Sequence, residues 1–407
     1  MRPRIITIHL LQTVPFSNLN RDDLGAPKTV TYGGRSRTRV SSQCWKRATR
    51  KHMEAALKDS PGYDRALRTR KPVTILADLL TGMGWAREQA LLAGRIVFAT
   101  YAKADSGDDT AATDTDATAT EAKADDAADN DTNSNVLLFL TDSQYADLAA
   151  VADEHKALFL ARKLDRKGGI DKDDKDFKPV RKTLNDIVRE PRGLITVFGR
   201  MIAAMPSANI ESAVQVAHAF TVHESAPEFD YFTAVDDYTH ADESGAGHLA
   251  SAEFTTGTYY RYANIDLDTL TEHVGDTAVA RDLAAQFLTS FAQSLPSGKA
   301  SGTAANTRPD LVIVQVRGDQ PLSYAAAFEK PVRHHGDGYL QSAVGQLAEH
   351  VTLINDAYGD DALWTGHLNA VTRDPLPFGD QIRGGIPALV AAAIGHTDLL
   401  AAGDAAA

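Results

Sequence analysis

The residues best suited to binding chemistry lie in one basic segment near the N-terminus. Residues 24–53 carry eight Lys and Arg side chains and no Asp or Glu, whereas the whole chain has 54 acidic and 42 basic residues and a formal net charge of −12. A net acidic composition argues against a polyanionic partner when charge is averaged over the chain. The segment is an exception to that average and predicts a bound polyanion. Its cations are Lys28, Arg35, Arg37, Arg39, Lys46, Arg47, Arg50 and Lys51.

Part of this charge falls on a predicted helix from about Gln43 to Leu57. Ser41 and Ser42 precede it and offer an N-cap. Four residues at helical spacing predict the face that packs on the first strand: Cys44, Ala48, His52 and Ala55. Cys44 is the only cysteine of the chain, so we expect it to pack as a small apolar residue.

The opposite face of this helix carries a polar stripe. At about 100° per residue, Gln43, Lys46 and Arg50 align, with Arg47 and Lys51 beside them. Lys and Arg neutralise phosphates, and Ser and Gln add neutral hydrogen bonds, so the stripe favours sequence-independent binding of a nucleic acid backbone. A charged stripe is more often a solvated helix face. The missing acids weigh against that interpretation here.

Two acidic pairs are the candidates for catalysis. Asp22 and Asp23 follow Asn20 and Arg21, and this loop is compatible with phosphate contacts, a metal-binding carboxylate pair or simple turn chemistry, of which the turn is favoured. Residues 236 and 237 are a second Asp pair, and joining the two pairs would give a two-metal nuclease. Nothing in the spacing requires it. The sequence has no P-loop, GxSxG, HExxH or paired-Cys pattern, so we expect no enzyme, no cofactor and no metal.

Short apolar runs predict the elements that position these residues. Residues 5–11 predict a central strand, and Gly33 and Gly34 predict a turn between extended pieces. Further strands are predicted at 193–202, 219–223, 258–265 and 311–316, with helices at 210–217 and 277–295. This order is typical of an α+β sandwich with helices on one face of the sheet.

Four other segments have a distinct composition. Residues 103–135 are rich in Ala, Asp and Thr and predict a disordered acidic insertion. Residues 153–182 predict a solvent-facing helical pair, residues 230–257 an extended hairpin, and residues 338–403 helices interrupted by prolines. Because no apolar run approaches the roughly 20 residues that cross a bilayer, we expect a cytoplasmic protein without a membrane partner.

Long motifs then point to a family. The run LNRDDLGAPKTVTYGGRSRTRVSSQCWKRATRK resembles the N-terminus of the CasC family, the backbone subunits of the type I-E CRISPR complex Cascade. Three later segments resemble the same family: GRM at 199–201, HAFTVHESAPEFDYFTAVDD at 218–237 and EFTTGTYYRYANIDL at 253–267. Motifs of this length in this order are far more specific than any short pattern.

The resemblance implies an α+β fold with an RRM-like (ferredoxin-like) palm, a helical fingers insertion and a β-hairpin thumb. The expected palm segments are 1–58, which includes the basic segment, 191–229 and 258–335. The expected fingers are residues 59–190, containing the acidic insertion at about 103–135. The thumb is expected at 230–257, and a C-terminal helical segment at 336–407.

The resemblance also implies which residues contact RNA. The residues similar to the family's RNA-backbone contacts are Asn20, Arg21, Lys28, Ser41, Gln43, Lys46 and Arg50. Met201, Phe232 and Thr233 match positions that hold or wedge the RNA at regular kinks. Lys299 matches a basic loop in which Ser301 replaces the second expected cation. Lys163 and Lys167 stand near the fingers lysines that the family uses against DNA.

The function implied is a CRISPR RNA-binding, non-enzymatic subunit of an antiviral defence ribonucleoprotein. Several copies would form a helical filament along one guide RNA (crRNA), contact other Cascade subunits and present the guide to target DNA. Two alternatives stay open. One is a metal-dependent ribonuclease that uses Asp22, Asp23, Asp236 or Asp237, as related CRISPR backbone proteins cut target RNA with a loop aspartate. The other is a monomeric single-strand RNA-binding protein.

Overall fold

Strand β1 (Ile5–Ser17) is the centre of the main sheet in the computed structural model, which describes residues 4–60, 63–99, 137–162, 175–202, 205–235, 246–334, 336–359 and 362–397. Nearly every residue of its apolar run is buried, on both faces of the strand. It pairs antiparallel with β9 (Ala246–Asp266) on one side and β10 (Leu311–Arg317) on the other. The predicted central strand is therefore confirmed and is longer than its apolar run.

The palm has the ferredoxin-like arrangement. In chain order it contains β1, α1 (Ser42–Leu57), β6 (Val214–Val216), β9, α9 (Thr277–Gln293) and β10. In space the four strands lie in the order β10-β1-β9-β6, and all neighbours are antiparallel. This βαββαβ order with the first strand in the middle confirms the predicted fold class.

Additional strands widen this sheet on both sides. Beyond β10 lie β11 (Ala362–Asn369) and β12 (Asp380–Gln381). Beyond β9 lie β7 (Ala219–Thr221), β3 (Arg35–Val40) and β2 (Thr29–Tyr32), so the basic segment itself supplies edge strands. Gly33 and Gly34, both with positive φ, form the predicted turn between β2 and β3.

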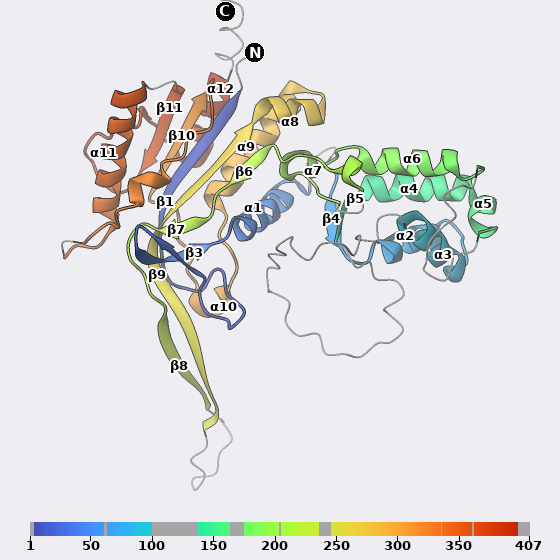
Figure 1. Cartoon of the computed structure of the whole chain (residues 1–407), viewed down its shortest axis with the longest axis horizontal. Helices are drawn as coiled ribbons and strands as arrows, with labels where there is room; N and C mark the ends of the chain where they lie inside the picture. The colour runs from blue at the N-terminus through green and yellow to red at the C-terminus, as the bar shows by residue number, and fades with distance from the viewer. Residues whose placement is uncertain are drawn as a thin grey trace, which may run out of the picture.

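Helices cover both faces of the sheet, whereas the sequence predicted one covered face. On one face, α1, α9 and α12 (Gly385–His396) pack against inward residues of β1 such as Ile8 and Leu10. On the other face, α11 (Leu340–Tyr358) and η2 (Ala325–Phe328) pack over Leu11, Tyr260 and Ile313. The sheet surface that an RRM leaves open is therefore buried (Figure 1).

Residues 59–190 contain a second core beside the palm. The elements in order are β4 (Ala66–Thr69), α2 (Pro72–Gly82), α3 (Arg87–Phe98), β5 (Leu138–Thr141), α4 (Asp142–Glu154), α5 (Lys156–Leu160) and α6 (Lys178–Arg189). β4 and β5 form a two-stranded sheet, and the helices enclose an apolar core of their own. This unit extends to one side of the palm as the fingers (Figure 1).

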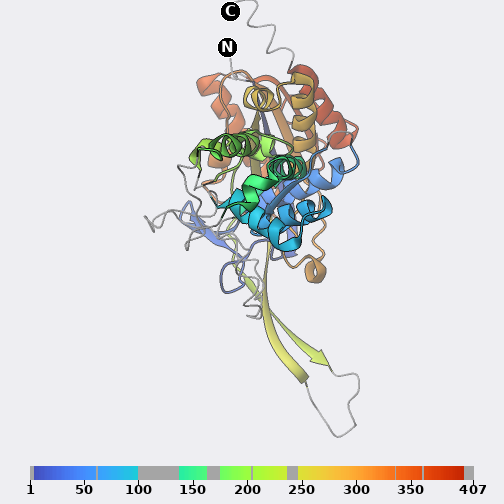
Figure 2. The same ribbon diagram turned by 90° about the vertical axis from the view of Figure 1, so that its right-hand side faces the viewer.

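The thumb is a long hairpin. Strand β8 (Glu228–Val235) pairs with the first half of β9, whose second half runs into the palm sheet. Figure 2 shows the hairpin projecting beyond the body of the molecule. The hairpin predicted at 230–257 is confirmed in its strands. Residues 236–245, with the Asp pair at 236 and 237, lie outside the described residues, as do the acidic insertion, Lys163 and Lys167.

Two secondary-structure predictions were wrong. The apolar run at 193–202 is not a strand: it forms the short helix α7 (Ile195–Phe198) between Gly193 and Gly199, whose positive φ values end any extended run. The helix predicted at 210–217 is strand β6, because this segment pairs with β9 at the sheet. Tertiary pairing overrode the local pattern in the second case.

The C-terminal region is not wholly helical as predicted, because it contributes β11 and β12 to the sheet. The remaining short elements are η1 (Pro206–Ala208), α8 (Leu267–Val274) and α10 (Ala300–Thr303). Among the helices that the structure describes, none is both long enough and apolar enough to cross a bilayer.

Candidate nucleic-acid interface

Helix α1 places the polar stripe, but its buried face differs from the predicted one. Ser41 is the N-cap, and its Oγ accepts a hydrogen bond from the N–H of Cys44 at 3.2 Å. The buried face consists of Trp45, Thr49 and Met53, one position along from the predicted set, and Ala55 is exposed. The large indole of Trp45 gains more from burial than the small side chains of Cys44 and Ala48, so it sets the rotation of the helix.

Lys46 has the electrostatics of an anion-binding group. It is half-buried, and burial alone lowers its pKa. Within the described part of the chain, no carboxylate forms an ion pair with Lys46 or with the exposed Arg47 beside it. Gln43 is also exposed one turn before Lys46. A partly desolvated cation without a counter-charge is stabilised by any phosphate that binds beside it.

Arg50 is committed to a different contact. Its guanidinium forms an ion pair with Glu54, and the two side chains are only 14% and 13% exposed. The same guanidinium lies 5.4 Å from the ring centroid of Phe139, on strand β5 of the fingers. Lys51 Nζ also donates to Glu54, at 2.7 Å. Glu54 is the first residue after the acid-free segment, and its carboxylate neutralises the positive charge at this end of the stripe.

Buried polar groups hold the loop before β2 against the start of α1. The side-chain oxygen of Asn20 accepts a hydrogen bond from the N–H of Ser41 at 2.8 Å, and both residues are buried. The N–H of Lys28 donates to the carbonyl of Asn20 at 3.0 Å. Arg21 and Lys28 are partly exposed on the loop so formed. Asn20 and Ser41 thus fix the place from which Arg21 and Lys28 extend.

The side chain of Asp22 stabilises this loop. Its Oδ1 accepts hydrogen bonds from the N–H groups of Leu24 and Ala26, both at 2.9 Å. This is the turn chemistry favoured by the sequence. Asp23 is exposed. In the described residues, no group of three or more His, Cys, Asp or Glu is placed to hold a metal ion.

Lys299 joins the same surface from a distant part of the chain. It is exposed and adopts a left-handed conformation with φ of 48°. The preceding Gly298 lies so close to the loop that a Cβ there would be 2.5 Å from the carbonyl oxygens of Asn18 and Leu19. This close approach requires glycine and brings Lys299 beside the Asn20 loop.

The remaining predicted contacts lie apart from this surface. Met201 is 77% exposed, so it does not pack in the core. Phe232 is half exposed on β8 of the thumb. Thr233 pairs with Leu249 in the thumb backbone, and its side chain lies outside the described ones. Most of the predicted residues thus lie on three elements that contact one another, namely the Asn20 loop, the start of α1 and the Lys299 loop, and these form one converged basic surface. Arg50 is instead paired with Glu54, and the thumb residues and Met201 lie apart.

Three other arginines of the basic segment have protein partners. Arg37 is fully buried and donates to the carbonyls of Thr221 and Phe328 at 3.0 and 3.2 Å. Arg35 forms a long ion pair with Glu224 at 3.7 Å. Arg39 contacts His218, whose Nδ1 also lies 3.2 Å from the N–H of Ser42. Charge counting alone could not separate these structural cations from the surface ones.

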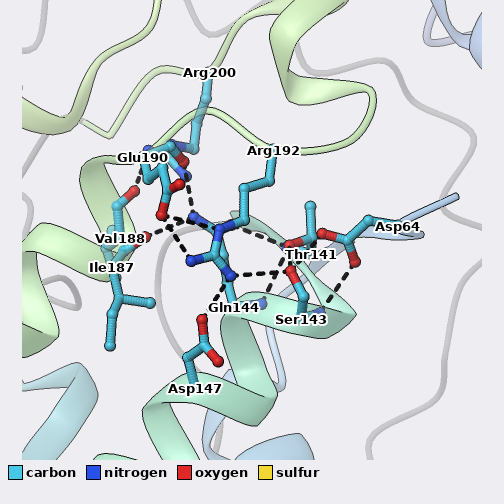
Figure 3. A network of polar contacts seen from close by, with 10 residues as sticks. All are labelled: Asp64, Thr141, Ser143, Gln144, Asp147, Ile187, Val188, Glu190, Arg192 and Arg200. Atoms are coloured by element: carbon cyan, nitrogen blue, oxygen red, sulfur yellow. Dashed lines mark hydrogen bonds and ion pairs between the residues drawn. The ribbon is translucent and has the colours of Figure 1, made fainter. Parts of the chain in front are cut away.

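A polar network ties the fingers to the palm where the chain enters and leaves them (Figure 3). Arg192 donates to Asp147 and Glu190, both at 2.6 Å, and to Ser143 at 3.1 Å. The N–H of Ser143 in turn donates to Asp64 at 3.0 Å. Next to them, Arg200 donates to the carbonyls of Val188 and Ala208. The network joins the segment that enters the fingers, helix α4 and the segment that leaves the fingers in one place.

Comparison with known proteins gives consistent matches. The sequence matches the CT1975-like protein family over residues 6–383. A solved chain described as a CRISPR RNA-guided surveillance complex, pre-nicking, is 37% identical with a TM-score of 0.81, covering 97% of this chain and 100% of that one. A second, described as a CRISPR RNA-guided surveillance complex, is 34% identical with a TM-score of 0.71, covering 96% and 99%. No curated protein matches.

Proposed function

Because this chain belongs to the CT1975-like family, the CasC-type backbone subunits of CRISPR surveillance complexes, we propose that it binds the guide RNA of a type I-E Cascade complex in several copies. The observation that carries the RNA-binding role is the converged basic surface. Lys46 and Arg47 on α1, Lys28 on the loop and Lys299 lie on elements that contact one another, and Lys46 and Arg47 have no ion-paired carboxylate among the described residues.

The proposed binding mode follows from which groups reach the surface. Lys28, Lys46 and Lys299 neutralise phosphates, while Gln43 adds a neutral hydrogen bond. Because both faces of the palm sheet are covered, the RNA lies along the loops and the helix start and not across the strands. Bases that are not gripped by the protein stay available to pair with target DNA, which then supplies the sequence specificity.

Most of the predicted RNA contacts fall into three groups in this proposal. Gln43, Lys46, Lys28, Arg21 and Lys299 reach outward and contact RNA directly. Asn20 and Ser41 bond to each other and act by holding the loop in place. Met201 and Phe232 are exposed at the two outlying positions, where they are available to wedge between bases.

We propose that the chain itself does not cleave nucleic acid. The use of Asp22 Oδ1 as the acceptor of two backbone N–H groups supports this. Incubating the assembled complex with Mg²⁺ and an RNA complementary to the guide tests it, and we expect intact target RNA. Regular cleavage that disappears in Asp23→Ala would establish the ribonuclease alternative.

We expect Lys46→Ala to weaken RNA binding uniformly across sequences and to reduce the magnitude of the slope of log K against log salt by about 0.7, the value for one lost phosphate contact on a single strand. We expect Arg50→Ala to leave this slope unchanged, because its charge is already paired with Glu54. The measurement is a salt titration of single-stranded RNA binding. Lys58→Ala is the matched control, since Lys58 is an exposed cation that caps the end of the same helix. Equal slopes for Lys46→Ala and wild type would exclude the phosphate contact.

Assembly distinguishes the proposed subunit from a monomeric RNA-binding protein. Native mass spectrometry of the chain co-expressed with a guide RNA measures copies per RNA. We expect several copies on each guide, because head-to-tail contacts that do not close continue along a strand. A single copy per RNA of guide length would support the monomeric alternative.

A further inference from the structure

Phe16 has an unusual conformation and exposure at the end of β1. Its φ is +43°, and within the described residues only Lys299 and Ala304 are other non-glycine residues with positive φ. The register between β1 and β9 shifts between Val14 and Ser17, so Phe16 lies within an irregularity of the strand pair. Such bulges redirect a side chain. The ring of Phe16 is 63% exposed, so the backbone strain is not offset by burial of the ring in the core.

Neighbouring groups hold Phe16 in this position. Its N–H donates to Thr256 Oγ1 at 3.0 Å. Its ring meets that of Phe254 edge to face, with centroids 6.0 Å apart and an interplanar angle of 75°. Phe254 is itself partly exposed. The two rings form a fixed aromatic pair at the base of the thumb, which is called the Phe16–Phe254 pair below.

The pair lies between the basic surface and the thumb. Two residues after Phe16, the side-chain amide of Asn18 donates to the carbonyls of Gly25 and Glu253, at 3.0 and 2.9 Å, and so joins the basic loop to strand β9. The Lys299 loop rests on the same Asn18 backbone. The cations that would bind phosphates and the exposed rings of the Phe16–Phe254 pair are thus only a few residues apart, and the contacts of Asn18 fix them relative to one another.

The face of the hairpin beside Phe254 favours bases over phosphates. Glu228 is directly opposite Phe254 in the strand register, so the two share a face. Asp230, two residues on, points to the same face, and both acids are exposed. Carboxylates repel phosphates, whereas an aromatic ring attracts the face of any base. Phe232 lies further along this same face.

We propose that the Phe16–Phe254 pair is a stacking platform for one unpaired nucleobase of the bound guide RNA, with Phe16 as the residue in contact. This rests on the proposed function. The phosphates of the same nucleotide stretch are held by the cations of the Asn20 loop and Lys299, and the base turns toward the thumb. Stacking on an aromatic side chain tolerates any base, which suits a subunit that binds guides of every sequence.

The test uses the full chain assembled on guide RNAs that carry 2-aminopurine at successive single positions. Stacking on an aromatic ring quenches this base, so we expect quenching at one position for each bound copy. The variant Phe16→Gly removes the ring and also relieves the left-handed strain, so it folds. It is expected to restore the fluorescence and to weaken RNA binding about 5-fold to 150-fold, without changing the salt dependence. Phe16→Tyr is expected to retain the quenching.

Phe229→Ala is the matched control, because Phe229 is similarly exposed but faces the other side of the hairpin, opposite Glu253. We expect it to leave the quenched position unchanged. Quenching that persists in Phe16→Gly would overturn the platform. Fewer copies per guide without any change in fluorescence would overturn it in favour of a contact between protein copies. If the wild-type chain binds no guide RNA, the proposed function itself is wrong. This result differs from the two outcomes above, in which the wild-type chain binds RNA.

Discussion

Replacing Arg261 with alanine is expected to lower the free energy of unfolding by about 3–5 kcal/mol. Arg261 is on strand β9, is only 1% exposed and lies inside the palm core. Its guanidinium stacks on Trp45 of α1, 3.7 Å from the ring centroid, and lies 4.7 Å from the centroid of Phe291 on α9. It donates to Gln12 Oε1 at 2.6 Å and to the carbonyl of Phe291. The guanidinium therefore connects the central strand with α1 and α9, two of the three helices on this face.

The expected loss has two causes. Truncation leaves a cavity between two aromatic rings, and it leaves the buried oxygens of Gln12 and Phe291 without a donor. Burial lowers the pKa of Arg261 to about 9, so the side chain is still a cation near pH 7 and its interaction with the indole of Trp45 is a desolvated cation–π contact. Each contribution is of the order of 1–3 kcal/mol.

Urea unfolding of the full chain measures this prediction. Arg308→Ala is the control, because Arg308 is exposed. Arg261→Lys keeps the charge but loses the planar stack, so we expect an intermediate loss. A change below about 1 kcal/mol in Arg261→Ala would show that the core closes around the missing group. Because Trp45 precedes Lys46 on α1, the same variant is also expected to disturb RNA binding.

Acidification from pH 7 to pH 4.5 is expected to destabilise the chain by about 3 kcal/mol through His9 alone. His9 is fully buried beneath α11, where its Nδ1 lies 2.9 Å from the hydroxyl of Tyr260 and its ring stacks on Tyr324 at 4.6 Å. Burial, together with the nearby Arg317 cation, lowers the pKa of His9 from 6.5 to about 3. The folded chain thus keeps His9 neutral over a range in which an unfolded chain protonates it.

The sign follows from proton binding. Between pH 6.5 and about 3 the unfolded state binds one more proton at this position, so stability is complete above pH 6.5 and is lost as the pH falls toward 3. At pH 4.5, two units below the unfolded pKa, the loss is about 3 kcal/mol at 1.36 kcal/mol per unit.

The urea midpoint as a function of pH tests this, with His9→Gln expected to flatten the profile. Burial also lowers the pKa values of His223 and His367, so a smaller slope is expected to persist in the variant. His334→Gln serves as the control because His334 is exposed. An unchanged profile in His9→Gln would contradict the prediction.

The sequence anticipated the features that depend on short-range pattern. The apolar β-branched run of β1, the glycine turn at Gly33 and Gly34 and the Ser41 N-cap are all local, and each is present. The rotation of α1 was off by one position because several spacings gave an apolar face, and packing of Trp45 in the core selected among them. Strand β6 was mistaken for a helix because its partner β9 lies far along the chain.

The candidate site was predictable in composition and only partly in geometry. Glu54, the partner of Arg50, lies four residues further along the chain. This spacing indicates a helical ion pair, so the pairing could have been predicted from the sequence alone. The stack of Arg50 on Phe139 was not predictable, because it depends on how the fingers sit on the palm. The same holds for Phe16, whose conformation is set by a register shift with β9 and leaves no mark in the local pattern.

The polar junction at Arg192 has a consequence for the architecture as a whole. Gly193, with φ of 53°, lies so close to Asp64 that a Cβ there would overlap its carbonyl oxygen, so the segment that leaves the fingers touches the segment that enters them. A unit whose two ends meet can be lengthened, trimmed or exchanged without altering the register of any palm strand. The fingers can therefore be exchanged as a unit. In a chimera between related subunits, the best junctions are near residues 64 and 193.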